Sequence, residues 1–166
     1  VKQDLGRALQ LYEAAWTHRY PPAACSLGLC YELGMGVPED RARAVELYRQ
    51  AADQGYAPAL CDLGLCYENA NGVAEDKVQA AECYRKAAEQ DYAPAMCNLA
   101  VCYLNGIGVE EDMAQAVAWF QKAVEGGSAR AKSILGDFYL DGRGVEQDKE
   151  RALSLYRESA ADGYLP

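Results

Sequence analysis

The feature that most constrains this chain is an internal repeat with an unbroken spacing of 36 residues. Aspartate marks the repeat at Asp4, Asp40, Asp76, Asp112 and Asp148. Two further columns keep the same step, an alanine column at Ala8, Ala44, Ala80, Ala116 and Ala152 and an aromatic column at Tyr12, Tyr48, Tyr84, Phe120 and Tyr156. The 166 residues therefore hold about four and a half copies of one unit. The units span about 4–39, 40–75, 76–111 and 112–147, with a partial unit at 148–166.

The first half of each unit predicts an amphipathic helix that begins at the repeating aspartate. The aspartate side chain can accept hydrogen bonds from the free amides of the first turn, and Asp76 with Gln79 has the spacing of a capping box. Apolar residues then recur at helical spacing on one side, at Ala44, Leu47, Tyr48, Ala51 and Ala52. Glycines such as Gly55 and Gly127 supply the stop.

The second half of each unit predicts another helix, which opens near a proline such as Pro22, Pro58 or Pro94. Its core face is Ala59, Leu63, Cys66 and Tyr67, with Gly64 leaving room for a neighbouring helix. A Gly-x-Gly-Val-x-x-Asp segment then leads into the next unit, and one of its glycines is expected at positive φ. The second unit departs from this pattern with Asn69, Ala70 and Asn71. Because asparagine tolerates the left-handed region, we expect this turn to survive with different geometry.

Neither helix of a unit can bury its apolar face alone, so the units must stack on one another. The sequence predicts an all-α solenoid of antiparallel helix hairpins with a 36-residue repeat, formed as a single array over 1–166. We expect nine helices, the last from Asp148 to about Ala161. Because the chain stops where a partner for this helix would begin, we expect a piece of a longer array. Apolar faces left uncovered at the ends would favour end-to-end association.

The repeated columns resemble the Sel-one-like repeat family, a relative of the tetratricopeptide proteins. The resemblance rests on three segments of the printed sequence, which are Ala59-x-x-x-Leu63-Gly64-x-x-Tyr67, Gly72-Val73-x-x-Asp76 and Ala80-x-x-x-Tyr84-x-x-Ala87-Ala88. It covers nearly the whole chain. The resemblance implies a right-handed superhelix of helix pairs that acts as an adaptor in protein complexes.

Composition and motifs argue against several other classes of function. The chain is 51% hydrophobic and carries a formal net charge of −9, which disfavours duplex nucleic acid and anionic membranes as main partners. No apolar run approaches the length of a membrane helix. His18 is the single histidine, and no catalytic triad, phosphate loop or metalloprotease motif is present. We therefore expect neither catalysis nor a cofactor or metal.

The seven cysteines are predicted to pack in the core as reduced thiols. Six form Cys-x4-Cys pairs on second helices, where the two residues stand about 7.5 Å apart in rise, too far for a disulfide. One branch of the resembled family, the cysteine-rich Helicobacter proteins, carries a bridge within each unit and has been associated with penicillin binding. The bridge positions align here with Ala52 and Leu60, and with Ala88 and Met96, so that association is not carried over. Reduced cysteines suggest a cytoplasmic location.

The predicted binding surface lies on the first helices, opposite their core stripe. In helical repeat arrays these helices line the concave side, and here they would form a shallow apolar floor with polar walls. Its candidate residues are Ala42, Glu46, Arg49, Val78, Glu82, Arg85, Ala114, Ala118, Gln121 and Arg157. A peptide or partner helix with acidic side chains would fit such a groove. The alternative is a solvated face whose glutamates and arginines pair at i, i+3.

Three function classes follow from these observations. The first is a non-enzymatic interaction scaffold or adaptor that binds another protein or a peptide. The second is a self-association module that stacks end to end. The third is an enzyme of the penicillin-interacting kind, which the missing bridge residues disfavour.

Overall fold

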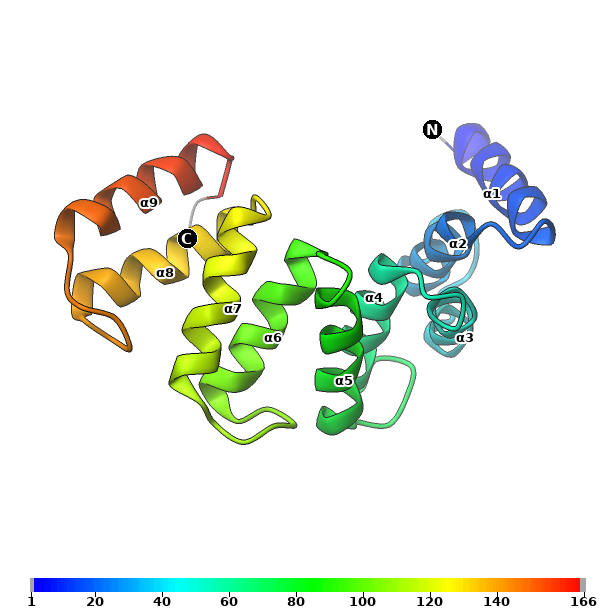
Figure 1. The fold of residues 1–166 in the computed structure, drawn as a ribbon. Coiled ribbons are helices and arrows are strands. Elements are labelled where there is room, and N and C mark those ends of the chain that lie inside the picture. Colours follow the sequence, from blue (N-terminus) through cyan, green and yellow to red (C-terminus); the bar gives the residue numbers. More distant parts are fainter. Residues whose placement is uncertain (1, 165–166) are drawn as a thin grey trace. The chain divides into compact units, whose positions relative to one another are not determined.

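The computed structural model describes residues 2–164 of the chain and contains nine α-helices within that range (Figure 1). Their bounds are α1 Lys2–Thr17, α2 Pro21–Leu33, α3 Arg41–Ala52, α4 Ala57–Glu68, α5 Lys77–Ala88, α6 Ala93–Asn105, α7 Met113–Glu125, α8 Ala129–Asp141 and α9 Lys149–Ala161. The ends of the predicted array, at residue 1 and at 165–166, lie outside the described residues. The all-α prediction of two helices per 36-residue unit is confirmed.

The helices fall into two compact units, Val1–Ala87 and Ala88–Pro166. In the first unit, α2 packs against α1 and α3, and α4 packs against α3 and touches α2. In the second unit, α7 packs between α6 and α8, and α8 packs against α9. Within each compact unit, the helices joined by these contacts thus bury apolar faces against one another, as expected for stacked hairpins.

Four of the five repeating aspartates cap first helices, whereas Asp4 lies inside α1, which begins at Lys2. The side chains of Asp40, Asp112 and Asp148 each accept a hydrogen bond from a backbone amide three residues later, at 2.9–3.0 Å. Asp76 does the same with the amide of Gln79. A full capping box also needs the Gln79 side chain to accept a hydrogen bond from the Asp76 amide, and this part of the prediction is wrong. The Asp76 amide instead donates to the carbonyl of Tyr67, because the chain folds back on the preceding helix at that point.

Both glycines of the connecting turn adopt positive φ, rather than the single one predicted. Gly34 and Gly36, for example, have φ values of 65° and 80°. In the second repeat Ala70, at φ 54°, stands in place of the first left-handed glycine, rather than an asparagine. The turn survives as expected and keeps one hydrogen bond of its relatives, since the Asn71 amide donates to the Cys66 carbonyl just as the Met35 amide donates to the Cys30 carbonyl. Its geometry differs at the helix end, because α4 ends at Glu68 with Asn69 as its C-cap at φ −104°, where α2 has Gly34 at φ 65°.

The predicted core faces are confirmed. All five apolar residues chosen for α3 are buried, and so are Ala59, Leu63 and Cys66 on α4, while Tyr67 is half-buried. A β-carbon built on Gly64 would stand 2.6 Å from the ring of Tyr84, and Gly136 has the same relation to Tyr156 at 2.8 Å. These second helices need glycine because a tyrosine ring of the following first helix lies against their backbone.

The tyrosine rings are also tied by their hydroxyl groups. Tyr48 donates to Glu32 at 2.7 Å, and Tyr84 donates to Glu68 at 2.6 Å. One junction between repeats changes all three columns together, with Ala100 in the glycine column and Leu104 in the glutamate column of the third repeat, and Phe120 in the tyrosine column of the fourth. Phe120 instead stacks edge-to-face with Phe138, at 5.5 Å between ring centroids. This junction replaces a polar contact with an apolar one.

Candidate functional site

The first unit contains six of the predicted binding residues, on the outer faces of α3 and α5. Ala42 and Val78 are exposed, and 63% of the surface of Val78 is accessible to solvent. The two glutamates and two arginines are half-buried. They are Glu46 and Arg49 on α3, and Glu82 and Arg85 on α5. These residues lie on the surface as the sequence predicted.

The two arginines of this face form the ion pairs foreseen in the alternative interpretation. A guanidinium nitrogen of Arg49 lies 3.5 Å from the Glu46 carboxylate, and another donates to the Tyr67 hydroxyl at 3.3 Å. Arg85 is 2.7 Å from Glu82. The pairing orders the arginines, while 43% of the Arg49 side chain and 35% of the Arg85 side chain stay exposed to solvent.

The remaining four predicted residues are exposed in the second unit. Ala114, Ala118 and Gln121 lie on α7, and Arg157 lies on α9. Their binding role remains a prediction.

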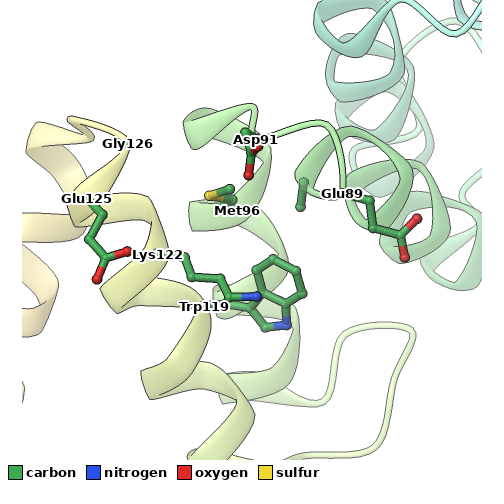
Figure 2. A pocket seen from close by; sticks show the side chains of 8 residues that line it. Glu89, Asp91, Met96, Trp119, Lys122, Glu125 and Gly126 are labelled. Atoms are coloured by element: carbon green, nitrogen blue, oxygen red, sulfur yellow. The ribbon is translucent and has the colours of Figure 1, made fainter.

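A cavity in the second unit was missed by the sequence reasoning. It has a volume of about 510 Å³ and is formed by the end of α5, the turn before α6, the first half of α6, and α7. Its lining residues are Ala88, Glu89, Asp91, Met96, Trp119, Lys122, Glu125 and Gly126 (Figure 2). One signal in the sequence could have found it. Trp119 stands in a column that otherwise holds Leu11, Leu47, Cys83 and Leu155, all smaller residues.

The indole of Trp119 is the centre of this cavity. The Lys122 ammonium nitrogen sits 4.3 Å from the centroid of the indole ring, in a cation–π contact that Figure 2 shows. Met96 is buried behind it. Asp91 lies in the turn at φ 59°, in a column where three other units have glycine. A carboxylate is therefore held at the rim in a backbone conformation that glycine adopts more easily.

The first unit contains a second, smaller cavity of about 230 Å³, lined by Glu32, Asp62, Leu65, Cys66, Asn69 and Asn71. Glu32 accepts hydrogen bonds from the Tyr48 hydroxyl and from the Asn71 amide nitrogen, both at 2.7 Å. The Asn71 amide oxygen is buried without a hydrogen-bond partner among the described residues. Burial, and then the nearby Glu32 carboxylate, raise the pKa of Asp62 to about 6.

The comparisons with known proteins identify the family. A model described as Sel1 repeat matches residues 1–15, 21–56, 57–92, 93–128 and 129–164. The chain belongs to the Sel1 repeat family. Its matched repeats keep the 36-residue period and begin at the second helix of each predicted unit. No curated protein matches the chain.

Solved Sel1-repeat structures have the same fold. A Sel1 repeat protein from Oxalobacter formigenes is 34% identical, with a TM-score of 0.92 over 99% of this chain and 67% of that one. A protective antigen of uropathogenic Escherichia coli with an SLR fold is 37% identical, with a TM-score of 0.86 over 96% of this chain. The present chain spans 34% of the length of that antigen. The likeness shows that this Sel1-repeat chain is a helical solenoid; the right-handed twist stays a prediction.

Cysteine-rich protein B of Helicobacter pylori is a more distant structural relative, at 28% identity and a TM-score of 0.62 over 81% of this chain. In the present Sel1-repeat chain all seven cysteines are free, and six of them are buried. Burial raises the pKa of Cys83 to about 11 and that of Cys66 to about 12. These thiols are protonated at neutral pH and behave as small apolar residues.

Residues 2–164 contain neither a metal-binding cluster nor a membrane-spanning helix. No group of three or more histidine, cysteine, aspartate or glutamate side chains in that range could hold a metal ion. No helix in the described part of the chain is long and apolar enough to cross a membrane. His18 is exposed just beyond α1.

Proposed function

We propose that this Sel1-repeat chain is a non-enzymatic scaffold that binds a peptide or a partner helix on the exposed faces of its first helices. Proteins with this repeat commonly mediate protein interactions. One observation carries the proposal. The faces of α3 and α5 repeat the same surface chemistry one unit apart, with an exposed small apolar residue followed by a glutamate–arginine pair. A surface that repeats in this way suits an extended partner.

The proposed partner carries acidic side chains. The guanidinium groups of Arg49 and Arg85 are preoriented by their glutamates, and a carboxylate can approach the exposed edge of each fork. Arg157 offers a further exposed guanidinium in the second unit. Ala42 and Val78 would contact the apolar part of the same partner.

The test is a triple substitution, Arg49→Glu, Arg85→Glu and Arg157→Glu, in a pull-down with the intact chain. We expect capture of the partner to be lost while the helical circular dichroism stays unchanged. A matched control replaces Arg19, Arg130 and Arg143 with glutamate; these exposed arginines lie outside the first helices, and the net charge changes equally. Equal capture by both triple variants would remove the first-helix faces from consideration.

A second candidate function, end-to-end self-association, is favoured by a specific observation. Leu11 is 63% exposed, whereas Leu47 and Leu155 in the same column are each 2% exposed. Leu153 is 48% exposed, whereas Val45, Ala81 and Val117 in its column are 7% exposed or less. These two leucines lie in columns that a neighbouring repeat covers elsewhere, so a second copy could cover them here.

Sedimentation velocity over a concentration series tests self-association. We expect the sedimentation coefficient to rise with concentration in the parent chain and to stay constant in the Leu11→Glu, Leu153→Glu variant. Monomeric behaviour of the parent chain at every concentration would reject this function.

We also propose that the chain has no penicillin-directed activity and works in a reducing compartment. The bridge positions of the cysteine-rich relatives hold Ala52, Leu60, Ala88 and Met96, all of them buried apolar residues. A fluorescent penicillin should label no residue, and labelling at a defined residue would refute the first statement. Free thiols in protein purified from its native host under alkylating conditions would support the second, and disulfides there would refute it.

A further inference from the structure

We propose that the Trp119 cavity of the second unit binds an arginine side chain of the partner. By the Trp119 cavity we mean the eight residues that line the 510 Å³ hollow described above. The proposal deepens the scaffold function and rests on it, because it names the chemistry of one group of the bound partner. It follows from the shape of the cavity, its aromatic wall and its unbalanced charge.

The cavity has room for a long side chain, and its walls suit the stem of one. A cavity of about 510 Å³ falls within the range of small-ligand sites. The buried side chain of Met96 and the half-buried indole of Trp119 supply apolar surface for a methylene stem. Tryptophan and arginine are the residue types that most often dominate binding at protein interfaces.

The indole face already holds a cation. Lys122 extends along α7 and places its ammonium 4.3 Å from the ring centroid (Figure 2). Lys122 is exposed and takes part in no ion pair among residues 2–164. Its contact with the indole therefore shows that a cation can bind this ring face, and a cation of the partner can displace the Lys122 ammonium from it. A guanidinium is the better occupant, since it is planar, stacks on aromatic rings and is less strongly hydrated than an ammonium.

The charge around the indole is in excess of what Lys122 can balance. Three carboxylates line the cavity, those of Glu89, Asp91 and Glu125, against the one ammonium. None of the three takes part in an ion pair within the described part of the chain. The arginines of the first unit, by contrast, are paired with glutamates. In Figure 2 Glu89 points away from the indole.

Asp91 holds a backbone conformation that glycine adopts more easily. Gly55, Gly127 and Gly163 take the left-handed conformation in this column, and Arg19 and Asp91 take it with a side chain. Replacing such a residue with glycine relieves the backbone strain. The structure therefore predicts a trade-off at one residue, in which Asp91→Gly makes the fold more stable and the cavity a weaker binder of arginine.

The experiment titrates the whole chain with three blocked tripeptides, acetyl-Gly-Arg-Gly-amide, acetyl-Gly-Lys-Gly-amide and acetyl-Gly-Glu-Gly-amide. The readout is the indole N–H signal of Trp119 in a proton–nitrogen correlation spectrum. The signal of Trp16, on α1 of the other unit, serves as the internal control. We expect the arginine peptide to shift the Trp119 signal at the lowest concentration, the lysine peptide to follow, and the glutamate peptide to leave it unchanged.

Three variants sharpen the test. Trp119→Leu introduces the leucine that three other repeats hold in this column, and it should weaken arginine binding, measured by calorimetry, about 5-fold or more. Asp91→Gly should weaken it while raising the melting temperature. Lys122→Gln should tighten it about 3-fold, because the internal competitor is removed and the cavity becomes more negative.

Several outcomes would overturn the proposal. One is a shift of the Trp119 signal with the glutamate peptide that is as large as the shift with the arginine peptide. A second is an equal shift of the Trp16 and Trp119 signals. A third is that the Lys122→Gln variant binds the arginine peptide more weakly than the parent chain does. Failure here is separable from failure of the scaffold function. If the arginine peptide does not bind while the triple arginine variant still loses its partner, only the Trp119 cavity is rejected.

Discussion

The contact between Gly64 and Tyr84 gives the sharpest test of the packing. Replacing an ordinary glycine inside a helix with alanine raises the free energy of unfolding by about 0.5–1 kcal/mol. At Gly64 the new β-carbon would stand 2.6 Å from Cε1 of Tyr84, well inside van der Waals contact. The ring is fully buried, and its hydroxyl is held by Glu68 at 2.6 Å, so it cannot swing aside. Overpacking of this kind costs about 1–3 kcal/mol.

We therefore expect Gly64→Ala to lower the free energy of unfolding by about 1–2 kcal/mol, the overpacking cost exceeding the helical gain. Urea unfolding followed by far-ultraviolet circular dichroism measures the change. The matched control is Gly6→Ala on α1, where a β-carbon meets no heavy atom within 4 Å. That variant should gain about 0.5–1 kcal/mol. If both variants shift stability in the same direction, the account of the Gly64–Tyr84 contact is wrong.

A triple variant then asks whether the three columns act together. Gly64→Ala, Glu68→Leu and Tyr84→Phe give the junction of the second and third repeats the combination that the next junction holds in Ala100, Leu104 and Phe120. Ala100 and Phe120 are both fully buried, so this combination packs well in its own unit. We expect the triple variant to lose less stability than the sum of its single changes, because the ring is released from its hydroxyl anchor. Additive losses would show that the columns are independent.

Three further predictions follow from the local structure. Ala70→Gly should stabilise the fold by about 0.5–1 kcal/mol in urea unfolding, because Ala70 sits at φ 54°; a loss of stability would contradict the strain at this turn. In the native state the pKa of Asp62 is about 6, whereas its ordinary value is 3.8. The protonated carboxyl therefore contributes most to the stability of the fold below pH 4, and this contribution is lost as pH rises through 6. Asp62→Asn should therefore exceed the parent chain in stability at pH 7, by at most about 3 kcal/mol, and the gap should close at pH 4; a pH-independent gap would refute the assignment. The raised pKa values of Cys66 and Cys83 predict that a thiol-reactive chromophore labels these residues slowly at pH 8 in the folded chain and fast in urea, and equal rates would show that the thiols are open to solvent.

The candidate site was recovered from the sequence only in part. Exposure of the first-helix faces followed directly from helical periodicity, because residues opposite a core stripe must face solvent. The Trp119 cavity did not follow, although the tryptophan was visible as an outlier in its column. Its walls come from three helices, α5, α6 and α7, and the turn between the first two, and a hollow depends on how their side chains leave space.

The sequence by itself determined the hairpin repeat, the aspartate caps, the proline starts and the core faces of the helices. Each of these depends on residues within a few positions of one another, and the 36-residue period repeats the evidence in every unit. Only the tertiary structure decided what the turns and contacts became. The cap amide of Asp76 pairs with the Tyr67 carbonyl, Ala70 accepts a glycine conformation, and Gly64 faces a tyrosine ring. These outcomes are set by competition among hydrogen bonds and steric contacts between neighbouring helices, which no local pattern records.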